Sequence, residues 1–353
     1  MPPEVIQTVL GPISADSLGV TMCHEHLLID ARDALFKEPS DPEERNLAHR
    51  PVSLEFLRWL HLNWESNLDN LVLDSEQLAI EEALRYRQAG GDGLIDCTLE
   101  GIGRNPPGLD RIARATGLHI IMGSGYYVAP THPPHVSRMT EDQITAEIIS
   151  DFTRGVADTG IRAGIIGEIG SSWPLVPEEE KVFRAAGAAQ VELGCGLTTH
   201  PGRHPDSPFQ LLRILRSAGA DLTRVIIGHI ERTVPDLDRL KVLADTGCFL
   251  AYDIFGTEVT AKHPYRALGI DIPSDAQRLE QIRALIDAGH GPQLLVSQDV
   301  GMKHRTRRYG GIGYDHIVRD ILPWMRQRGF QETAINRLVI DNPRRALALP
   351  EVH

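Results

Sequence analysis

Two histidines that could hold a metal ion, His24 and His26, stand one residue apart in a short apolar run, Thr21–Leu28. In an extended strand alternate side chains share a face, so both imidazoles point one way and Glu25 points the other. Neutral imidazole binds zinc and its first-row neighbours, and a strand fixes the separation of the two rings. The stretch predicts a metal site, although two polar residues at a strand end that bind nothing would fit it equally well.

Four more residues of metal-binding type follow apolar stretches farther along the chain: Glu168, His200, His229 and Asp299. The first three are about one strand–helix unit apart, and Asp299 follows two units later, beside the first strand if the sheet closes. Each residue taken alone is explained equally well as a buried polar group that forms a hydrogen bond with a neighbour. Together, each at the carboxyl end of a predicted strand, they predict one centre.

Four histidines and two carboxylates exceed the ligands of one tetrahedral zinc and fit two ions that share a carboxylate. The expected division is one ion on His24, His26 and Asp299, one on His200 and His229, and Glu168 between them. Zinc is the first expectation for both divalent ions, with manganese, cobalt or iron as alternatives. Asp299 is also the expected proton acceptor in catalysis.

Eight apolar stretches that alternate with helical ones must position these residues. The predicted strands are 18–28, 93–98, 118–123, 163–169, 196–200, 224–230, 248–252 and 294–298. Eight strands, each followed by a helix, predict an α/β fold of the (β/α)8 TIM-barrel class with its site at the carboxyl ends of the strands. An open doubly wound sheet is the alternative, but no glycine-rich dinucleotide fingerprint follows the first strand.

The whole chain, residues 1–353, is expected to form a single domain with two additions to the barrel. A short β segment at 4–10 precedes the first barrel strand, and a long polar segment at about 30–74 follows that strand. An insertion of this length next to a metal site is a candidate lid. Its amphipathic stretch, 54–64, either closes over a substrate or packs against a second copy of the chain.

Composition restricts the partners and the compartment. The net charge is −12 and no cluster of Lys and Arg has the pattern of a phosphate-binding stripe, so neither nucleic acid nor an anionic membrane surface is expected. The start lacks a signal-peptide pattern and no apolar run reaches about 18 residues, so we expect a soluble, cytoplasmic protein. Cys23, Cys97, Cys195 and Cys248 each lie in an apolar stretch, as is typical of buried thiols in a reducing compartment.

Blocks along nearly the whole chain resemble the phosphotriesterase family of the amidohydrolase superfamily, and within it the phosphotriesterase-related branch. The blocks are Thr21–Leu27, Gly164–Leu175, His200–Arg203, Gly228–Thr233, Tyr252–Glu258 and Tyr309–Tyr314. The resemblance implies the barrel, a binuclear centre and a metal-bridging hydroxide as the nucleophile. Two positions depart from the best-known phosphotriesterases: Glu168 replaces their carboxylated lysine, as in the related branch, and Ile254 replaces a histidine that often follows the aspartate of strand seven. Both departures argue against efficient organophosphate hydrolysis as the native activity.

The same resemblance implies a substrate class. Animal proteins of the related branch look like amidases of small N-acylated amino-sulfonates such as N-acetyltaurine, so we expect hydrolysis of a small amide or ester with an anionic group. A lactonase, or a promiscuous phosphotriesterase or aryl esterase, is the alternative within the family. A non-catalytic barrel that binds a small molecule is the alternative of another class. A serine hydrolase is disfavoured because no Gly-x-Ser-x-Gly elbow accompanies the histidines.

Four residues in loops after the strands are expected to contact the substrate: Tyr127, Trp173, Arg203 and Tyr309. For the aromatic residues, core packing is an equal alternative. The guanidinium of Arg203, three residues past His200, could pair with a carboxylate, sulfonate or phosphate of the substrate, or with a neighbouring carboxylate. Besides this small molecule, a second copy of the chain in a homodimer is the expected partner.

Overall fold

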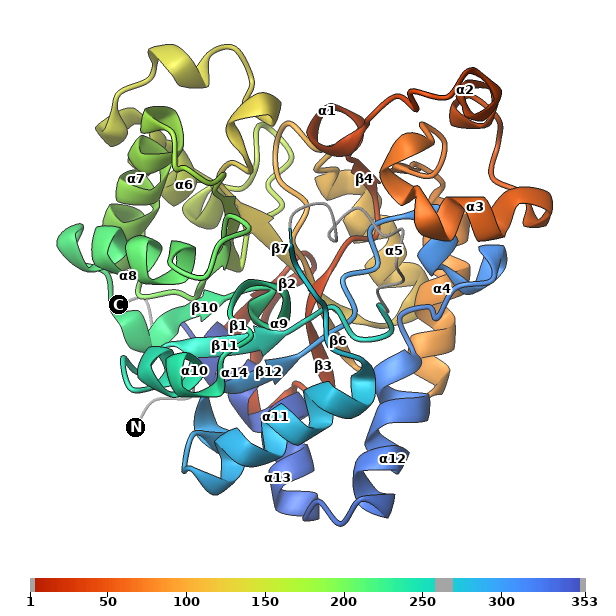
Figure 1. Cartoon of the computed structure of the whole chain (residues 1–353). Coiled ribbons are helices and arrows are strands. Elements are labelled where there is room, and N and C mark those ends of the chain that lie inside the picture. Colours follow the sequence, from red (N-terminus) through yellow and green to blue (C-terminus); the bar gives the residue numbers. More distant parts are fainter. Residues whose placement is uncertain (1–3, 258–268, 350–353) are drawn as a thin grey trace.

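The computed structural model describes residues 4–257 and 269–349, and in them the eight predicted strands form one parallel sheet (Figure 1). The strands are β3 (Thr21–Glu25), β6 (Gly93–Asp96), β7 (His119–Ser124), β8 (Ile165–Gly170), β9 (Leu197–His200), β10 (Val225–Ile227), β11 (Phe249–Tyr252) and β12 (Leu294–Val296). They pair in this order, with helices between them. The predicted (β/α)8 barrel is confirmed. Glu258, which ends one family-like block, lies outside the described residues.

Side chains alternate between the barrel interior and the surrounding layer of helices. Along β6, Ile95 joins an interior cluster with Cys23 and Phe249, whereas Leu94 joins the cluster shared with the helices. Strands that are buried on both faces need apolar residues throughout, which explains the continuous apolar runs of the sequence. All four cysteines are buried free thiols, as predicted.

The helices lie outside the strands, and several of them begin at a side-chain cap. They are α4 (Glu76–Gln88), α5 (Pro106–Thr116), α6 (Glu141–Thr153), α7 (Pro177–Leu193), α8 (Ser207–Ser217), α9 (Ile230–Thr233), α10 (Leu237–Ala244), α11 (Asp275–Asp287), α12 (Leu322–Gln327), α13 (Glu332–Asn336) and α14 (Asn342–Leu347). The Ser75 hydroxyl accepts a hydrogen bond from the Leu78 N–H, and Thr140 and Gln143 form a capping box. None of the helices in the described residues combines the length and apolar character that a membrane span requires.

An antiparallel hairpin of β1 (Val5–Thr8) and β2 (Gly11–Ser14) precedes the barrel, as predicted for the amino-terminal β segment. Ile6 of this hairpin and Leu347 of α14 belong to the cluster in the barrel interior. Val5 also forms a β-bridge with Leu349. The first and last described segments therefore cover one end of the barrel interior together.

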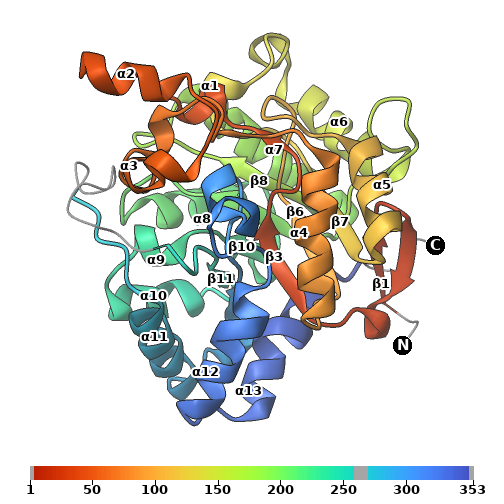
Figure 2. The same ribbon diagram turned by 90° about the vertical axis from the view of Figure 1, so that its right-hand side faces the viewer.

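The segment between β3 and β6 is a folded insertion. Its elements are β4 (Ile29–Asp30), α1 (Arg32–Leu35), α2 (Pro42–Ala48), α3 (Leu57–Leu62) and β5 (Val72–Leu73). Strands β4 and β5 pair, and Val52, Phe56 and Leu60 form a small core within the insertion. Two views place α1, α2 and α3 together at the end of the molecule opposite α12 and α13 (Figure 1, Figure 2).

The loop after β12 fastens this insertion to the barrel. The Lys303 N–H donates to the Asn70 carbonyl at 3.0 Å, and the Lys303 ammonium lies 2.6 Å from the Asp69 carboxylate. The His304 N–H donates to the Asn70 side-chain oxygen at 3.0 Å. Because this loop begins at Asp299, the insertion lies at the carboxyl end of the barrel, next to the predicted site.

The buried carboxylate of Glu25 closes the barrel where, in the described residues, no ladder pairs β3 with β12. Its Oε1 accepts hydrogen bonds from the Ser297 hydroxyl at 2.7 Å and from the Gln298 N–H at 2.9 Å and side-chain amide at 2.7 Å. Its Oε2 accepts from the Val300 N–H at 2.8 Å. Since Asp299 lies among these donors, Glu25 also fixes the backbone that carries Asp299.

We expect Glu25→Gln to lower the free energy of unfolding by about 3 kcal/mol, because the amide keeps one acceptor and turns its NH2 group toward hydrogen-bond donors. Chemical denaturation measures this loss. Glu55→Gln, which breaks an exposed ion pair with Arg50, is the control and should change stability by less than about 0.5 kcal/mol. Equal stability of Glu25→Gln and the native chain would show that the seam between β3 and β12 does not depend on this carboxylate.

Candidate metal centre

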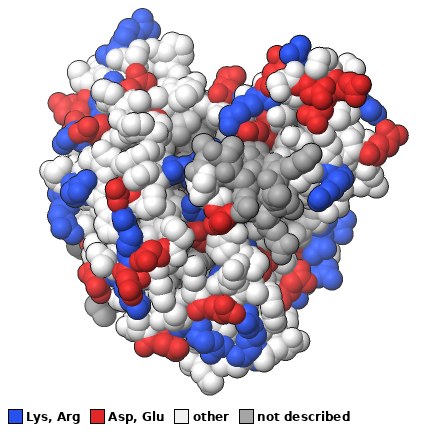
Figure 3. Space-filling view, viewed as in Figure 1, with Lys and Arg blue, Asp and Glu red and all other residues white. Residues whose placement is uncertain are grey.

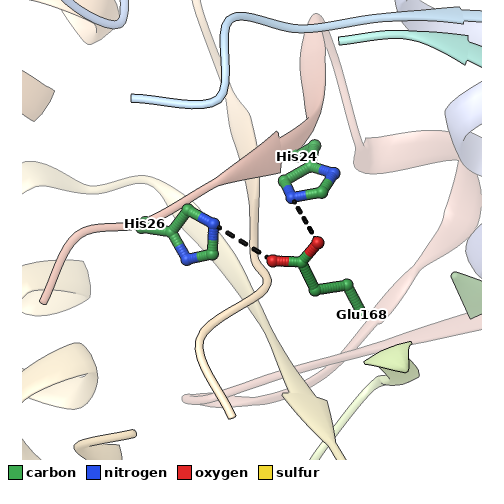
Figure 4. Close-up of side chains that lie close together, drawn as sticks. All are labelled: His24, His26 and Glu168. Atoms are coloured by element: carbon green, nitrogen blue, oxygen red, sulfur yellow. Dashed lines mark ion pairs between the residues drawn. The ribbon is translucent and has the colours of Figure 1, made fainter. Parts of the chain in front are cut away.

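Four histidines converge on the carboxylate of Glu168. Its Oε1 lies 3.4 Å from Nε2 of His26, and its Oε2 lies 3.3 Å from Nε2 of His24 (Figure 4). The same Oε2 lies 2.8 Å from Nδ1 of His200 and 3.4 Å from Nε2 of His229. One carboxylate therefore stands between two pairs of imidazoles, which is the arrangement that a bridging ligand requires.

Asp299 completes the cluster of six predicted metal-binding residues. Its Oδ1 lies 3.3 Å from Nε2 of His26 and 3.9 Å from Nε2 of His24. Its side chain is 26% exposed, whereas the side chains of Glu168, His24 and His26 are buried. Asp299 is thus the most exposed member of the cluster.

Three of the six residues lie beyond the ends of their strands: His26 after β3, His229 after β10 and Asp299 after β12. The predicted strand ends at residues 28 and 230 are therefore wrong. At His229 the backbone leaves the extended conformation, with a φ of +50°, and at Asp299 φ is +54°. Ala157 is the one other non-glycine residue of the described chain with positive φ. Such backbone costs of order 1–3 kcal/mol per residue and clusters at functional sites.

Asp253, which the sequence analysis did not include in the site, orients two of the imidazoles. Its Oδ2 lies 3.0 Å from Nδ1 of His24, and its Oδ1 lies 2.8 Å from Nδ1 of His229 and accepts from the His229 N–H. With Nδ1 donating to Asp253, the Nε2 lone pair of each ring points toward Glu168. Its position directly after β11, at the same barrel end as the other ligand types, was the available signal.

The donor set of the cluster fits metal ions. Nε2 of His24 is buried and has no hydrogen-bond partner among the described residues, and two groups of three ligand atoms, each within 4.8 Å of one another, share Glu168. Burial lowers the pKa of His200 to about 3, which keeps this ring neutral as a ligand must be. Burial also lowers the pKa of His26, but hydrogen bonds to Asp299 and Glu168 outweigh it and raise the value to about 9, so binding of a metal ion by this ring would release its proton. Imidazole nitrogens among buried carboxylates suit zinc and other first-row divalent ions.

Three cavities in the described part of the chain include residues of the cluster in their walls, and two of them share four lining residues. An inner cavity of about 60 Å³ includes His26, His229 and Asp299 in its wall, and a side cavity of about 460 Å³ opens next to it. Four residues line both: Leu35, Tyr127, His200 and Arg203. A substrate that spans the two cavities therefore passes the cluster.

The structure places three of the four predicted substrate residues on these cavities. The Tyr127 hydroxyl lies 3.1 Å from Nδ1 of His200, and Arg203 lies where the cavities meet. Trp173 lines the side cavity and stacks on His204, with ring centroids 4.1 Å apart. Arg232, which was not anticipated, lies with Nη2 3.0 Å from Nε2 of His200.

Tyr309 lies elsewhere. Its ring packs against the core of the insertion, formed by Val52, Phe56 and Leu60, and it lines neither of the two cavities. The chain turns directly after Tyr309, at Gly310 with a φ of +85°. The direction of the Tyr309 side chain could therefore not be predicted from its separation from Asp299 in the sequence. A role in holding the insertion to the loop after β12 fits this position better than substrate contact.

A TIM barrel that gathers imidazoles and carboxylates at the carboxyl ends of its strands is typical of metal-dependent hydrolases. The chain matches the sequence model of the phosphotriesterase family over residues 4–347 and belongs to that family. Enzymes of this family use a binuclear metal centre. The protein is therefore a metal-dependent hydrolase.

Curated relatives extend over almost the whole chain. The N-acetyltaurine hydrolase of Salmo salar is 41% identical over 343 residues, which are 97% of this chain and 97% of the relative. The N-acetyltaurine hydrolase of Homo sapiens is 40% identical with the same coverage of both chains.

Solved structures agree with the barrel. A resiniferatoxin-binding protein from Rhodobacter sphaeroides is 37% identical and superimposes with a TM-score of 0.93 over 97% of this chain and 94% of that chain. The phosphotriesterase homology protein from Escherichia coli, solved with phosphate in its active site, is 25% identical, with a TM-score of 0.73 over 93% and 98%.

We expect Asp253→Asn to weaken divalent metal binding 10- to 100-fold, because the amide cannot accept from both imidazoles and orients them less firmly. Competition with a chelator of known affinity measures the change. Asp238→Asn, at an exposed side chain of α10, is the control and should leave the affinity unchanged. Native affinity in Asp253→Asn would contradict the positioning role.

Proposed function

We propose that the protein hydrolyses a small N-acylated amide or ester with an anionic group, an N-acetyltaurine-like substrate, at a binuclear metal centre. The proposal is carried by one observation: four histidines converge on Glu168, and Asp299 lies beside two of them. Arg203 lines both cavities next to this cluster. Relatives about 40% identical and named N-acetyltaurine hydrolase support this substrate class.

In this proposal the ligands divide as follows: one ion on His24, His26 and Asp299, one on His200 and His229, and Glu168 between the two. The two overlapping groups of ligand atoms that share Glu168 support this division. Bound divalent ions supply a Lewis acid for a carbonyl group and lower the pKa of water toward neutrality. Zinc suits a site rich in imidazole and is the proposed metal.

The chain's own groups hold the rings and move the proton. Asp253 keeps Nδ1–H on His24 and His229, and the Thr98 hydroxyl lies 2.9 Å from Nδ1 of His26. Burial raises the pKa of Asp299, but its hydrogen bond with His26 and the charges of the nearby histidines outweigh it and lower the value. An ionised Asp299 takes the proton of the attacking water and delivers it to the departing nitrogen.

Arg203 supports an anionic substrate. This residue lines both cavities, and the planar fork of donors of a guanidinium matches two oxygens of a sulfonate or carboxylate. A substrate whose scissile carbonyl is at the cluster would extend its anionic end along Arg203.

Lactone hydrolysis is the second candidate. A solved structure described as an organophosphate hydrolase engineered from a weak promiscuous lactonase template is 26% identical, with a TM-score of 0.74 over 97% of this chain. The same cluster accommodates attack on a lactone carbonyl. Measured substrate preference separates the two candidates.

The proposal also includes the single domain, the compartment and the assembly. A cytoplasmic location is supported by four buried free thiols, since reducing conditions preserve them. Residues 30–74 serve as a lid within one domain of 1–353. Leu54, 75% exposed at the start of the amphipathic stretch, offers an apolar contact for a homodimer.

Two divalent ions per chain are expected in the purified protein, and Glu168→Gln should lose metal together with hydrolysis, by about 100-fold or more. Elemental analysis and assays with N-acetyltaurine, lactones, aryl esters and paraoxon measure both. Chelation should abolish activity and zinc should restore it. N-acetyltaurine as the best substrate supports the amidase, and lactones as the best substrates support the second candidate. If the protein holds one ion or none and hydrolyses no substrate after metal addition, the non-catalytic binding protein is the remaining interpretation.

Arg203→Met should raise KM for N-acetyltaurine about tenfold, because a charge-assisted contact contributes about 1.4 kcal/mol or more. KM for phenyl acetate, which has no charge, should change less than twofold. Arg203→Lys should recover part of the loss, since an ammonium keeps the charge without the fork. An equal rise for both substrates would mean that Arg203 supports the cavity structure instead.

A further inference from the structure

The side cavity lies between the insertion and the loops that follow the barrel strands. Lys37 and Glu65 line it from the insertion, and Trp173 and Arg203 line it from the loops after β8 and β9. Figure 3 shows the surface hollowed between the part that carries α1 and the part that carries the loop after β7. The insertion is therefore one wall of the space next to the metal centre.

Glu65 holds Lys37 at this wall. The Lys37 N–H donates to the Glu65 carbonyl at 2.9 Å, and the Lys37 ammonium lies 3.0 and 3.1 Å from the two carboxylate oxygens. Glu65 is buried, whereas the Lys37 side chain is 62% exposed. The buried carboxylate thus fixes the ammonium, and the exposed ammonium remains accessible to a second anion.

The charges on the side cavity favour an anion. Among the described residues, its charged lining residues are Lys37, Glu65 and Arg203, which sum to +1, in a chain whose net charge is −12. The two cations come from different walls, Lys37 from the insertion and Arg203 from the loop after β9. An anionic group between them is attracted from both sides, and a cation is attracted only by a carboxylate that already has a partner.

The inner cavity has the opposite character away from the ligands. Its wall includes Ile29, Ala31, Leu35, Trp64 and Ile102. Its volume of about 60 Å³ compares with about 460 Å³ for the side cavity and accommodates about four water-sized groups. A short apolar group fits there, whereas a sulfonate or carboxylate would lose its hydration and would meet one cationic lining residue among the described residues, Arg203, instead of the two of the side cavity.

We propose that Lys37, positioned by Glu65, is a specificity-determining residue that binds the anionic end of the substrate opposite Arg203. The substrate lies with its short acyl group in the inner cavity, its carbonyl at the metal centre and its anionic end in the side cavity. The insertion therefore selects the substrate as well as covering it. This inference rests on the proposed function for the position of the carbonyl.

Lys37→Met tests the inference, because it removes the charge and keeps most of the side-chain length. KM for N-acetyltaurine should rise about three- to tenfold with kcat within twofold, and KM for phenyl acetate should stay unchanged. Lys37→Arg should remain close to the native enzyme. The effect should shrink in 0.5 M salt, since the ammonium is exposed to solvent.

Arg50→Met is the matched control, because Arg50 is another cation of the insertion, paired with Glu55 and absent from the cavity wall. It should leave both KM values unchanged. A loss that is equal for Arg50→Met and Lys37→Met, or equal for charged and neutral substrates, would overturn the inference.

Binding of propane-1-sulfonate, measured by calorimetry, separates this inference from the proposed function because it needs no catalysis. A dissociation constant three- to tenfold higher in Lys37→Met supports the anion site even if no amide is hydrolysed. Identical binding by the native and Lys37→Met proteins rejects the site even if N-acetyltaurine is hydrolysed. For the acyl end, kcat/KM should fall at least tenfold from N-acetyltaurine to N-hexanoyltaurine, and an undiminished value would overturn the orientation.

Discussion

The structure depends on one buried carboxylate, Glu25, which joins the first barrel strand to the last. Hydrogen bonds from Ser297, Gln298 and Val300 replace the ladder between β3 and β12 in the described residues. Alternation along β3 sends His24 to the metal centre and Glu25 to the seam, so one short strand serves both. A change in its register would move both groups at once, which couples closure of the barrel to assembly of the site.

Buried charge is the second constraint at the carboxyl end of the barrel. Glu168 and Asp253 are almost fully buried, and each contacts at least two imidazoles. In His24 and His229, Asp253 contacts Nδ1, and Glu168 lies on the Nε2 side of the ring. Carboxylates without such partners would be strongly destabilising in this interior, so the histidines contribute to folding as well as to metal binding.

Much of the fold and of the cluster could be predicted from sequence, since both depend on local patterns. Continuous apolar runs mark doubly buried strands, and ligand-type residues directly after them, such as His200, share one end of the barrel. The position of Asp253 after β11 indicated that it lies at this end of the barrel, but its contacts with His24 and His229 depend on distances that only the folded chain defines. Tyr309 and Lys37 lie in long loops, and spacing in sequence does not determine where such side chains point.

The left-handed backbone of His229 and Asp299 has a consequence for the protein in the cell. Glycine adopts this conformation freely, whereas these residues keep it at the expense of stability. Ions that bind only the folded chain offset that loss by mass action, so metal supply and folding are linked equilibria. A chain that lacks its ions opens more often and is exposed to proteolysis and aggregation. Metal availability would then set the abundance of this enzyme as well as its turnover.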